Sequence, residues 1–188
     1  MTIQFISDIH GDAADLRRAL DSFAGENPDL IVLCGDYLNH GPRNPLPDGW
    51  SPKEVADILN AISQKIVAVR GNCDCEVDEM MLNFPCLCAS TNIFVQNRRI
   101  FVHHGHLYDR KKLSTWLPCG TLVVSGHTHV ALFEEENGIF YLNPGSISLP
   151  KSQDGKTFAS LKIESNANAQ ISLCSISSET IWTKNLWT

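Results

Sequence analysis

The chain alternates short apolar runs with polar segments. Five of the runs are rich in β-branched residues and bounded by turn-forming or polar residues, which is typical of strands. Their apolarity is continuous rather than alternating, so each strand should be buried on both faces. The predicted strands are Ile3–Ile6, Leu30–Leu33, Ile66–Val69, Ile100–Val102 and Leu122–Val124.

Two segments between the first three strands have helical periodicity. Apolar residues recur at helical spacing in Ala13–Phe23 and again in Lys53–Ser63. Asp12 can cap the first helix, and Ser51-Pro52 followed by Glu54 is typical of the start of the second. This strand–helix–strand–helix–strand order predicts parallel central strands joined by crossover helices.

After Pro85 the pattern changes to short strands separated by turns, which predicts a β-rich and largely antiparallel second half. We expect hairpin turns at Asn97-Arg98 and at Asn137-Gly138, the latter of type I′. The whole pattern predicts an α/β fold, a four-layer αββα sandwich of two mixed sheets, in a single domain covering 1–188. The further strands expected are Asn92–Gln96, Arg99–His104, Ala131–Glu135, Ile139–Leu142, Phe158–Ile163, Ile171–Ser175 and Thr180–Lys184.

Composition narrows the function classes. With 188 residues, of which 43% are hydrophobic, the chain can bury one sizeable core. A net charge of -6 argues against a stable complex with nucleic acid. The start of the chain lacks the pattern of a signal peptide, and no apolar run approaches the length of a membrane span, so a cytoplasmic protein without a membrane segment is expected. Seven cysteines, an odd number, fit such a reducing compartment.

Polar side chains appear where the predicted strands end. They are Asp8, His10, Asp36, Asn72, His104, His127 and His129. In open α/β sheets ligands bind outside the carboxyl ends of the strands. Carboxylate, carboxamide and imidazole donors in this ratio suit two divalent first-row cations that share one carboxylate. The sequence therefore predicts a binuclear metallohydrolase.

The ordered set D-x-H, G-D, G-N, H-G-H and G-H-T-H, followed by Asn143-Pro144-Gly145-Ser146, resembles the calcineurin-like metallophosphoesterase superfamily. Within it, the segments Asn39–Asn44 and Arg70–Asp74 resemble the bacterial YfcE-type phosphodiesterase subgroup. The resemblance extends over about the first 150 residues. It implies the same four-layer fold that the apolar pattern predicts.

The resemblance also implies the arrangement of the site. One metal would be held by Asp8, His10 and His129, the other by Asn72, His104 and His127, with Asp36 bridging the two. It implies a metal-dependent phosphodiesterase in which a hydroxide bridging the metals attacks a small phosphodiester. Mn²⁺ is the favoured metal, with Zn²⁺, Fe²⁺, Mg²⁺ and Ni²⁺ as alternatives. The family also favours a homodimer.

Three further residues are candidates. Cys73 stands where many members of the superfamily have histidine after G-N, so the general acid is missing or replaced. A thiol is a poor substitute for imidazolium beside an alkoxide, which predicts a preference for diesters with good leaving groups. In the long segment Tyr37–Ser51, His40 is expected to contact the phosphoryl group or replace the missing acid. Arg43 is expected either to bind the substrate anion or to pair with a neighbouring carboxylate.

Two other functions remain open. A non-catalytic scaffold, as in the retromer subunit of similar fold, should show loss of metal ligands, and this sequence shows none. A phosphomonoesterase or dinucleoside polyphosphatase of the same superfamily is the second alternative. Cys73 argues against it, because poor leaving groups need a proton donor.

Overall fold

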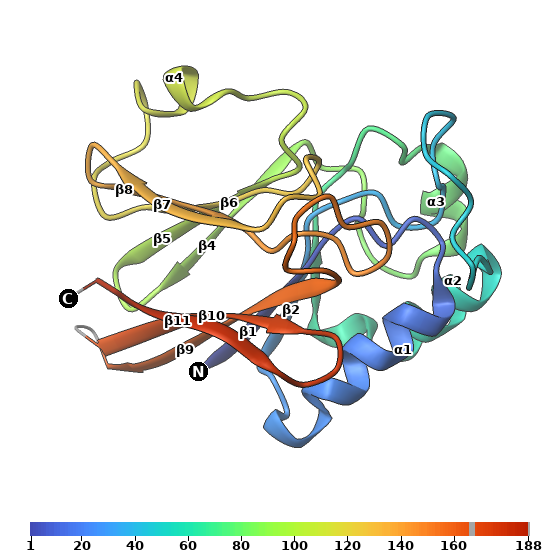
Figure 1. Cartoon of the computed structure of the whole chain (residues 1–188). Coiled ribbons are helices and arrows are strands. Elements are labelled where there is room, and N and C mark those ends of the chain that lie inside the picture. Colours follow the sequence, from blue (N-terminus) through green and yellow to red (C-terminus); the bar gives the residue numbers. More distant parts are fainter. Residues whose placement is uncertain (166–167, 188) are drawn as a thin grey trace.

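The computed structural model describes residues 1–165 and 168–187, and these form two facing sheets. The first sheet has six strands in the order β11-β10-β9-β1-β2-β3, and the second has five in the order β4-β5-β6-β8-β7 (Figure 1). The strands are β1 (Thr2–Ile6), β2 (Leu30–Leu33), β3 (Ile66–Ala68), β4 (Ser90–Val95), β5 (Arg98–His103), β6 (Leu122–Val124), β7 (Leu132–Glu136), β8 (Ile139–Asn143), β9 (Thr157–Ser165), β10 (Asn168–Ser175) and β11 (Thr180–Leu186).

Helical segments lie on the outer faces of both sheets, which confirms the predicted sandwich. Helices α1 (Ala13–Ser22) and α2 (Pro52–Ala61) pack on the first sheet, whereas the outer face of the second carries only the single turn α4 (Arg110–Leu113). A short helix α3 (Glu76–Met81) follows β3. Short 3₁₀ turns span Ala24–Glu26 and Ser63–Lys65. Within the described residues, no helix has the length and apolarity that crossing a membrane requires.

The helix starts follow from the residues predicted to form them. The Asp12 side chain accepts a hydrogen bond of 2.9 Å from the backbone N–H of Asp15, which satisfies one free donor of the first turn of α1. Pro52 is the first residue of α2, where its missing N–H costs no hydrogen bond. The Asp12 cap of α1 and the proline at the start of α2 fix where the chain turns away from the strand ends that carry the candidate ligands.

The parallel pairing extends further than the sequence predicted. Strand β1 pairs in parallel with β2, and β2 with β3, as expected. In the second sheet β5-β6 and β6-β8 are also parallel, and only the outer strands β4 and β7 are antiparallel to their neighbours. The prediction of a largely antiparallel second half is therefore right for β9–β11 and wrong for the centre of the second sheet.

One predicted turn is displaced by a residue. Val95 pairs with Arg98, so the β4–β5 turn is Gln96-Asn97, both at positive φ, and not Asn97-Arg98. Burial fixes this register, because it turns Val95 inward and leaves Phe94 70% exposed. The turn at Asn137-Gly138 has positive φ at both residues, as type I′ requires, and confirms the prediction.

One of the two large cores lies between the sheets. Ile3 and Phe5 of β1 point toward Ile100 and Leu122 of the second sheet, and all four are fully buried. On the outer face of the first sheet, α1 and α2 bury a second cluster that includes Leu59. A smaller cluster lies under α4. Because the sheets are packed on both faces, the strand ends are held rigidly relative to one another.

The packing of α2 can be tested at Leu59, whose side chain is fully buried. Leu59→Ala should lower the free energy of unfolding by about 2–5 kcal/mol, because it leaves a cavity under the helix. Urea unfolding in the presence of EDTA measures this without a contribution from bound metal. Lys53→Ala on the same helix is the matched control. Its side chain is 82% exposed, so the change should stay within about 0.5 kcal/mol. Equal stabilities of the two variants would contradict the packing.

Candidate metal centre

The ends of five strands bring the seven predicted ligands together. Asp8 and His10 follow β1, Asp36 follows β2, Asn72 follows β3, His104 follows β5, and His127 and His129 follow β6. Backbone hydrogen bonds join the first two loops: Asp8 N–H donates to the Gly35 carbonyl at 3.1 Å, and His10 N–H to the Asp36 carbonyl at 3.0 Å. The loops that carry the ligands are therefore extensions of the parallel pairing of the strands.

Most of these ligand positions have an unusual backbone. Asp8, His10, Asp36, His127 and His129 all have positive φ, between 50° and 71°. Residues other than glycine enter this left-handed region at a cost of roughly 1–2 kcal/mol each. Such conformations persist where the surroundings impose them, and they gather at functional sites. Here the positive φ angles turn the side chains of residues two positions apart in the same short loop, such as Asp8 and His10, toward a common centre.

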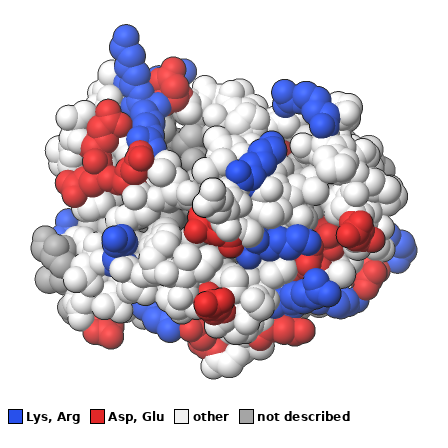
Figure 2. Space-filling model, in the orientation of Figure 1, with Lys and Arg blue, Asp and Glu red and all other residues white. Residues whose placement is uncertain are grey.

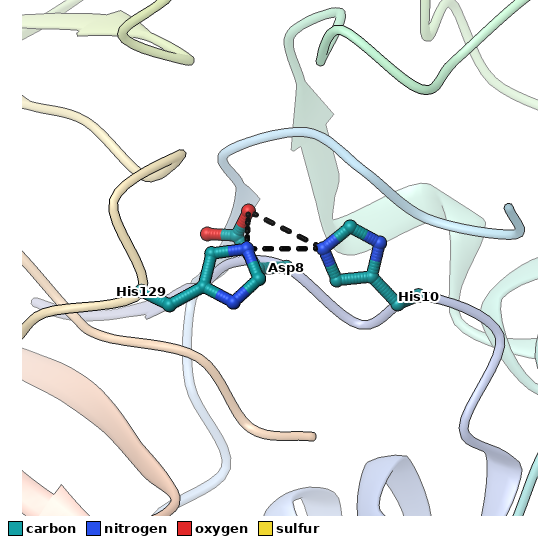
Figure 3. Close-up of side chains that lie close together, drawn as sticks. All are labelled: Asp8, His10 and His129. Carbon is teal, nitrogen blue, oxygen red and sulfur yellow. Dashed lines mark hydrogen bonds and ion pairs between the residues drawn. The ribbon is translucent and has the colours of Figure 1, made fainter. Parts of the chain in front are cut away.

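The first group consists of Asp8, His10 and His129, and Figure 3 shows their donor atoms pointing toward one another. The Nε2 atoms of the two imidazoles lie 3.1 Å apart, and the Oδ1 atom of Asp8 lies 3.8 Å from Nε2 of His10 and 3.3 Å from Nε2 of His129. The other ring nitrogen of each histidine faces a carbonyl: Nδ1 of His10 donates to Asn39 (2.9 Å), and Nδ1 of His129 donates to Leu149 (2.6 Å). A carbonyl only accepts, so Nδ1 carries a hydrogen in both rings, and the Nε2 atoms that face each other are the ones available to a metal.

The carboxylate of Asp8 completes this group. Its Oδ2 accepts hydrogen bonds from the Ser7 hydroxyl (2.6 Å) and from the His127 N–H (3.0 Å). Its Oδ1 is buried and has no hydrogen-bond partner among the described residues. A cation between this buried carboxylate oxygen and the two ring nitrogens would compensate the hydration that all three lose on folding. The donor set therefore fits a bound metal ion.

The second group is centred on Asp36. Its Oδ2 lies 3.7 Å from Nε2 of His10 and 3.4 Å from Nε2 of His104, so one oxygen faces both groups. Nε2 of His104 lies 3.1 Å from the side-chain oxygen of Asn72, while its Nδ1 donates to the Cys34 carbonyl at 2.7 Å. A backbone carbonyl thus orients three of the four candidate histidine ligands, His10, His104 and His129.

The charges of this group are coupled. Burial by itself lowers the pKa of His104, but its hydrogen bond with Asp36 and the nearby carboxylates raise that pKa to about 9. Burial likewise raises the pKa of Asp36, but the hydrogen bond and charge of His104 outweigh it and hold the pKa below the usual range. Burial lowers the pKa of His10 and of His127, which keeps both rings neutral at neutral pH. Without metal, His104 therefore holds a proton in the place of a cation.

Asp74 is a structural residue that the sequence did not single out. Its buried carboxylate accepts hydrogen bonds from the N–H groups of Asp36 (2.8 Å), Tyr37 (2.8 Å) and Gly71 (2.6 Å). Burial, followed by the charge of Asp36, raises the pKa of Asp74 to about 7. It joins the loops after β2 and β3. Because Asp74 lies in a polar loop, no hydrophobic periodicity of the sequence indicates that its side chain is buried.

The other predicted residues lie in different places. The Cys73 thiol is within reach of a group formed with His10 and Asp36, and burial together with the charge of Asp36 raises the pKa of Cys73 to about 12. Arg43 lines the same hollow as Asn72 and Cys73. The His40 ring instead lies edge-on to Trp50, with ring centroids 6.1 Å apart, in a separate and mostly apolar groove.

A cavity of about 400 Å³ opens over the two groups. Four of the candidate ligands line it: Asp36, Asn72, His127 and His129. Its other walls come from the loop after β2 and from the segment after β8, and they are Arg43, Asn44, Pro45 and Lys151. The volume suits a small ligand rather than a polymer.

Comparison with known proteins agrees with this geometry. Residues 1–166 match the calcineurin-like phosphoesterase superfamily domain. The chain is 42% identical over 161 residues to the phosphodiesterase YfcE of Escherichia coli (strain K12), covering 86% of this chain and 87% of that protein. The solved structure of the YfcE phosphoesterase from E. coli superposes with a TM-score of 0.91 and 37% identity, covering 99% and 100% of the two chains. Vacuolar protein sorting 29 of Cryptosporidium parvum, at a TM-score of 0.70, 17% identity and coverages of 98% and 97%, shares the fold alone.

These matches bear on both the fold and the site. They cover the segment that carries all seven candidate ligands, from Asp8 to His129. The family implies divalent metal ions, and the buried clusters of aspartate and histidine are groups that could hold them. The chain therefore belongs to the calcineurin-like phosphoesterase superfamily and is of the YfcE type within it.

Proposed function

We propose that the protein is a metal-dependent phosphoric diester hydrolase with a binuclear centre. The observation that carries this proposal is the pair of donor groups that meet at one oxygen of Asp36, 3.7 Å from Nε2 of His10 and 3.4 Å from Nε2 of His104. The 42% identity to a phosphodiesterase supports the reaction class. A carboxylate shared between two histidine groups is the arrangement that two cations need.

Each proposed ligand has a defined task. Asp8, His10 and His129 would hold one cation, and Asn72, His104 and His127 would hold the other, with Asp36 shared between the two groups. Two such cations would supply a hydroxide nucleophile near neutral pH and neutralise the phosphate oxygens. The carbonyls of Asn39, Leu149 and Cys34 keep three rings oriented with Nε2 toward the centre. Since this orientation exists before substrate binds, little reorganisation accompanies the reaction.

The remaining residues set the substrate preference. Arg43 lines the cavity and binds an anionic group of the substrate. The raised pKa of Cys73 keeps its thiol protonated and makes it a weak acid toward a departing alkoxide. Diesters with good leaving groups should therefore react faster than alkyl monoesters, and Mn²⁺ is our preferred metal because of the mixed nitrogen and oxygen donors.

The first prediction concerns metal removal and reaction class. Stripped of metal, the protein should lose hydrolysis of bis(p-nitrophenyl) phosphate, because no hydroxide nucleophile forms near neutral pH. Mn²⁺ should restore it. Release of p-nitrophenol by the diester and by p-nitrophenyl phosphate, with Mn²⁺, Mg²⁺, Zn²⁺ or no metal added, measures both points. Inactivity toward both esters despite bound metal would favour a scaffold, and faster monoester hydrolysis would favour a phosphomonoesterase.

The second prediction concerns the bridging carboxylate. Asp36→Ala should remove most diester activity, with a loss of 100-fold or more in kcat, because the shared oxygen disappears and an interaction at the reacting centre goes with it. Bound metal should also fall below that of the wild type in elemental analysis. Asp48→Ala, which removes an exposed carboxylate from the following loop, is the control and should retain metal and activity. A fully active Asp36→Ala protein holding two metals would refute the assignment.

The third prediction concerns His40. Because its ring lies against Trp50 outside the metal cavity, His40→Ala should act through the position of the loop that carries Arg43. We expect kcat/KM for the diester to fall about tenfold, less than the 10²–10⁴-fold typical of a lost general acid. Stopped assays with metal content checked in parallel measure this. A larger loss confined to poor leaving groups would restore the role of acid, and unchanged kinetics would reduce His40 to loop packing.

A further inference from the structure

Two basic side chains lie in the wall of the metal cavity. Arg43 comes from the loop after β2, and Lys151 comes from the segment after β8, more than one hundred residues later. The described residues that line this cavity include one arginine, Arg43, and one lysine, Lys151. Both are exposed to solvent. They are therefore available to an anion that enters the cavity.

The position of Lys151 is fixed by the metal centre itself. Its backbone N–H donates to the carbonyl of His129 at 2.9 Å, and two residues earlier the Leu149 carbonyl accepts from Nδ1 of His129. The hydroxyls of Ser146 and Ser148 donate to the Asp8 carbonyl at 2.8 and 2.9 Å. The segment that ends in Lys151 is thus bound to two candidate ligands along its length.

Neither the Arg43 nor the Lys151 side chain is paired with a carboxylate of the described residues. Several other basic side chains have carboxylate partners: Arg17 pairs with Glu54, Lys162 with Glu26, and Arg110 with Glu134. Figure 2 shows the same intermixing of basic and acidic side chains over the face it presents. Within residues 1–165 and 168–187, Arg43 and Lys151 form no such ion pair. Because Arg43 and Lys151 line one cavity and neither is paired with a carboxylate in the described part of the chain, both side chains are free to contact an anion in that cavity.

A count of charges indicates what that partner is. Two divalent cations against the carboxylates of Asp8 and Asp36 leave two positive charges, which the hydroxide nucleophile and a singly charged diester balance. Arg43 and Lys151 then remain as two further positive charges. A phosphomonoester group carries about 1.5–2 negative charges at neutral pH and offers three acceptor oxygens. One such group would balance both side chains.

We propose that Lys151 and Arg43 form an anion subsite, and that the substrate is a phosphodiester carrying a second phosphoryl group on one of its alcohol arms. This proposal rests on the proposed function and adds a substrate class to it. Arg43 and Lys151 do not take part in bond breaking. They position the substrate through the second phosphoryl group, so their removal should change KM more than kcat.

Two substrates that differ only in that group test the proposal. One is p-nitrophenyl 2-methoxyethyl phosphate, and the other is p-nitrophenyl 2-(phosphonooxy)ethyl phosphate. The Mn²⁺-loaded wild-type protein should show a KM about tenfold lower for the second, because a hydrogen-bonded charge pair of this kind changes affinity by about that factor. Raising the salt concentration should weaken this preference, since the groups are exposed.

Lys151→Met should remove most of the preference by raising KM for the phosphorylated substrate about tenfold, with a rise of about twofold for the methoxy substrate. Lys184→Met is the matched control, an exposed lysine on β11, and should keep the wild-type KM for both substrates. Calorimetric titration of the metal-loaded proteins with 1,2-ethanediol bisphosphate gives a readout independent of turnover. Its Kd should rise about tenfold in Lys151→Met and stay unchanged in Lys184→Met.

The outcomes separate the two proposals. If the wild type hydrolyses both substrates with equal KM, or if Lys151→Met keeps the preference, the subsite is refuted and the diesterase remains. If neither substrate is hydrolysed by the metal-loaded protein, the proposed function fails. Calorimetry then still decides whether Lys151 binds the bisphosphate. A Kd equal in the wild type and Lys151→Met would refute the subsite by itself.

Discussion

The burial of two carboxylates among imidazole side chains is the constraint on which the rest of this structure depends. Asp8 and Asp36 are almost completely buried, and an uncompensated carboxylate in such a place costs several kcal/mol. In the metal-free protein a protonated His104 compensates Asp36. No described residue donates a hydrogen bond to Oδ1 of Asp8. The folded state is therefore complete only with a cation at this point, and metal binding should contribute directly to its stability.

The same constraint explains the strained backbone around the centre. Five ligand residues have positive φ, and the sheets alone would not maintain them. Instead, loops are bound to loops: the carboxylate of Asp74 holds three N–H groups, and Ser146 and Ser148 hold the carbonyl of Asp8. Glycine is required where these loops touch, because a Cβ at Gly71 or Gly126 would collide with the oxygens of Asp36 or Ser7. In the motifs G-D, G-N and G-H-T-H, the residue after the glycine is thus a candidate ligand. The glycine leaves room for the loop that packs against it.

The sequence predicted the features that depend on the type and spacing of side chains. It missed the features that depend on contacts of the backbone. The apolar runs gave the strands, Asp12 gave the start of α1, and the polar residues at strand ends gave the candidate ligands. The carbonyls of Asn39, Leu149 and Cys34 orient three histidines, yet carbonyl groups leave no signal in a sequence. Lys151 was missed for the same reason, since its placement depends on hydrogen bonds to His129 that only the folded chain forms. The parallel centre of the second sheet was missed because its crossovers lack long amphipathic helices.

The fold by itself does not separate an enzyme from an interaction scaffold, since vacuolar protein sorting 29 has a similar fold. The distinction has to come from the strand ends. Two imidazole nitrogens 3.1 Å apart beside a carboxylate oxygen without a hydrogen-bond partner among the described residues lose their hydration on folding, so this site favours a bound cation. With the cations in place, the two unpaired basic side chains make the cavity attractive to a small, multiply charged anion, while the net charge of -6 of the whole chain disfavours a long polyanion.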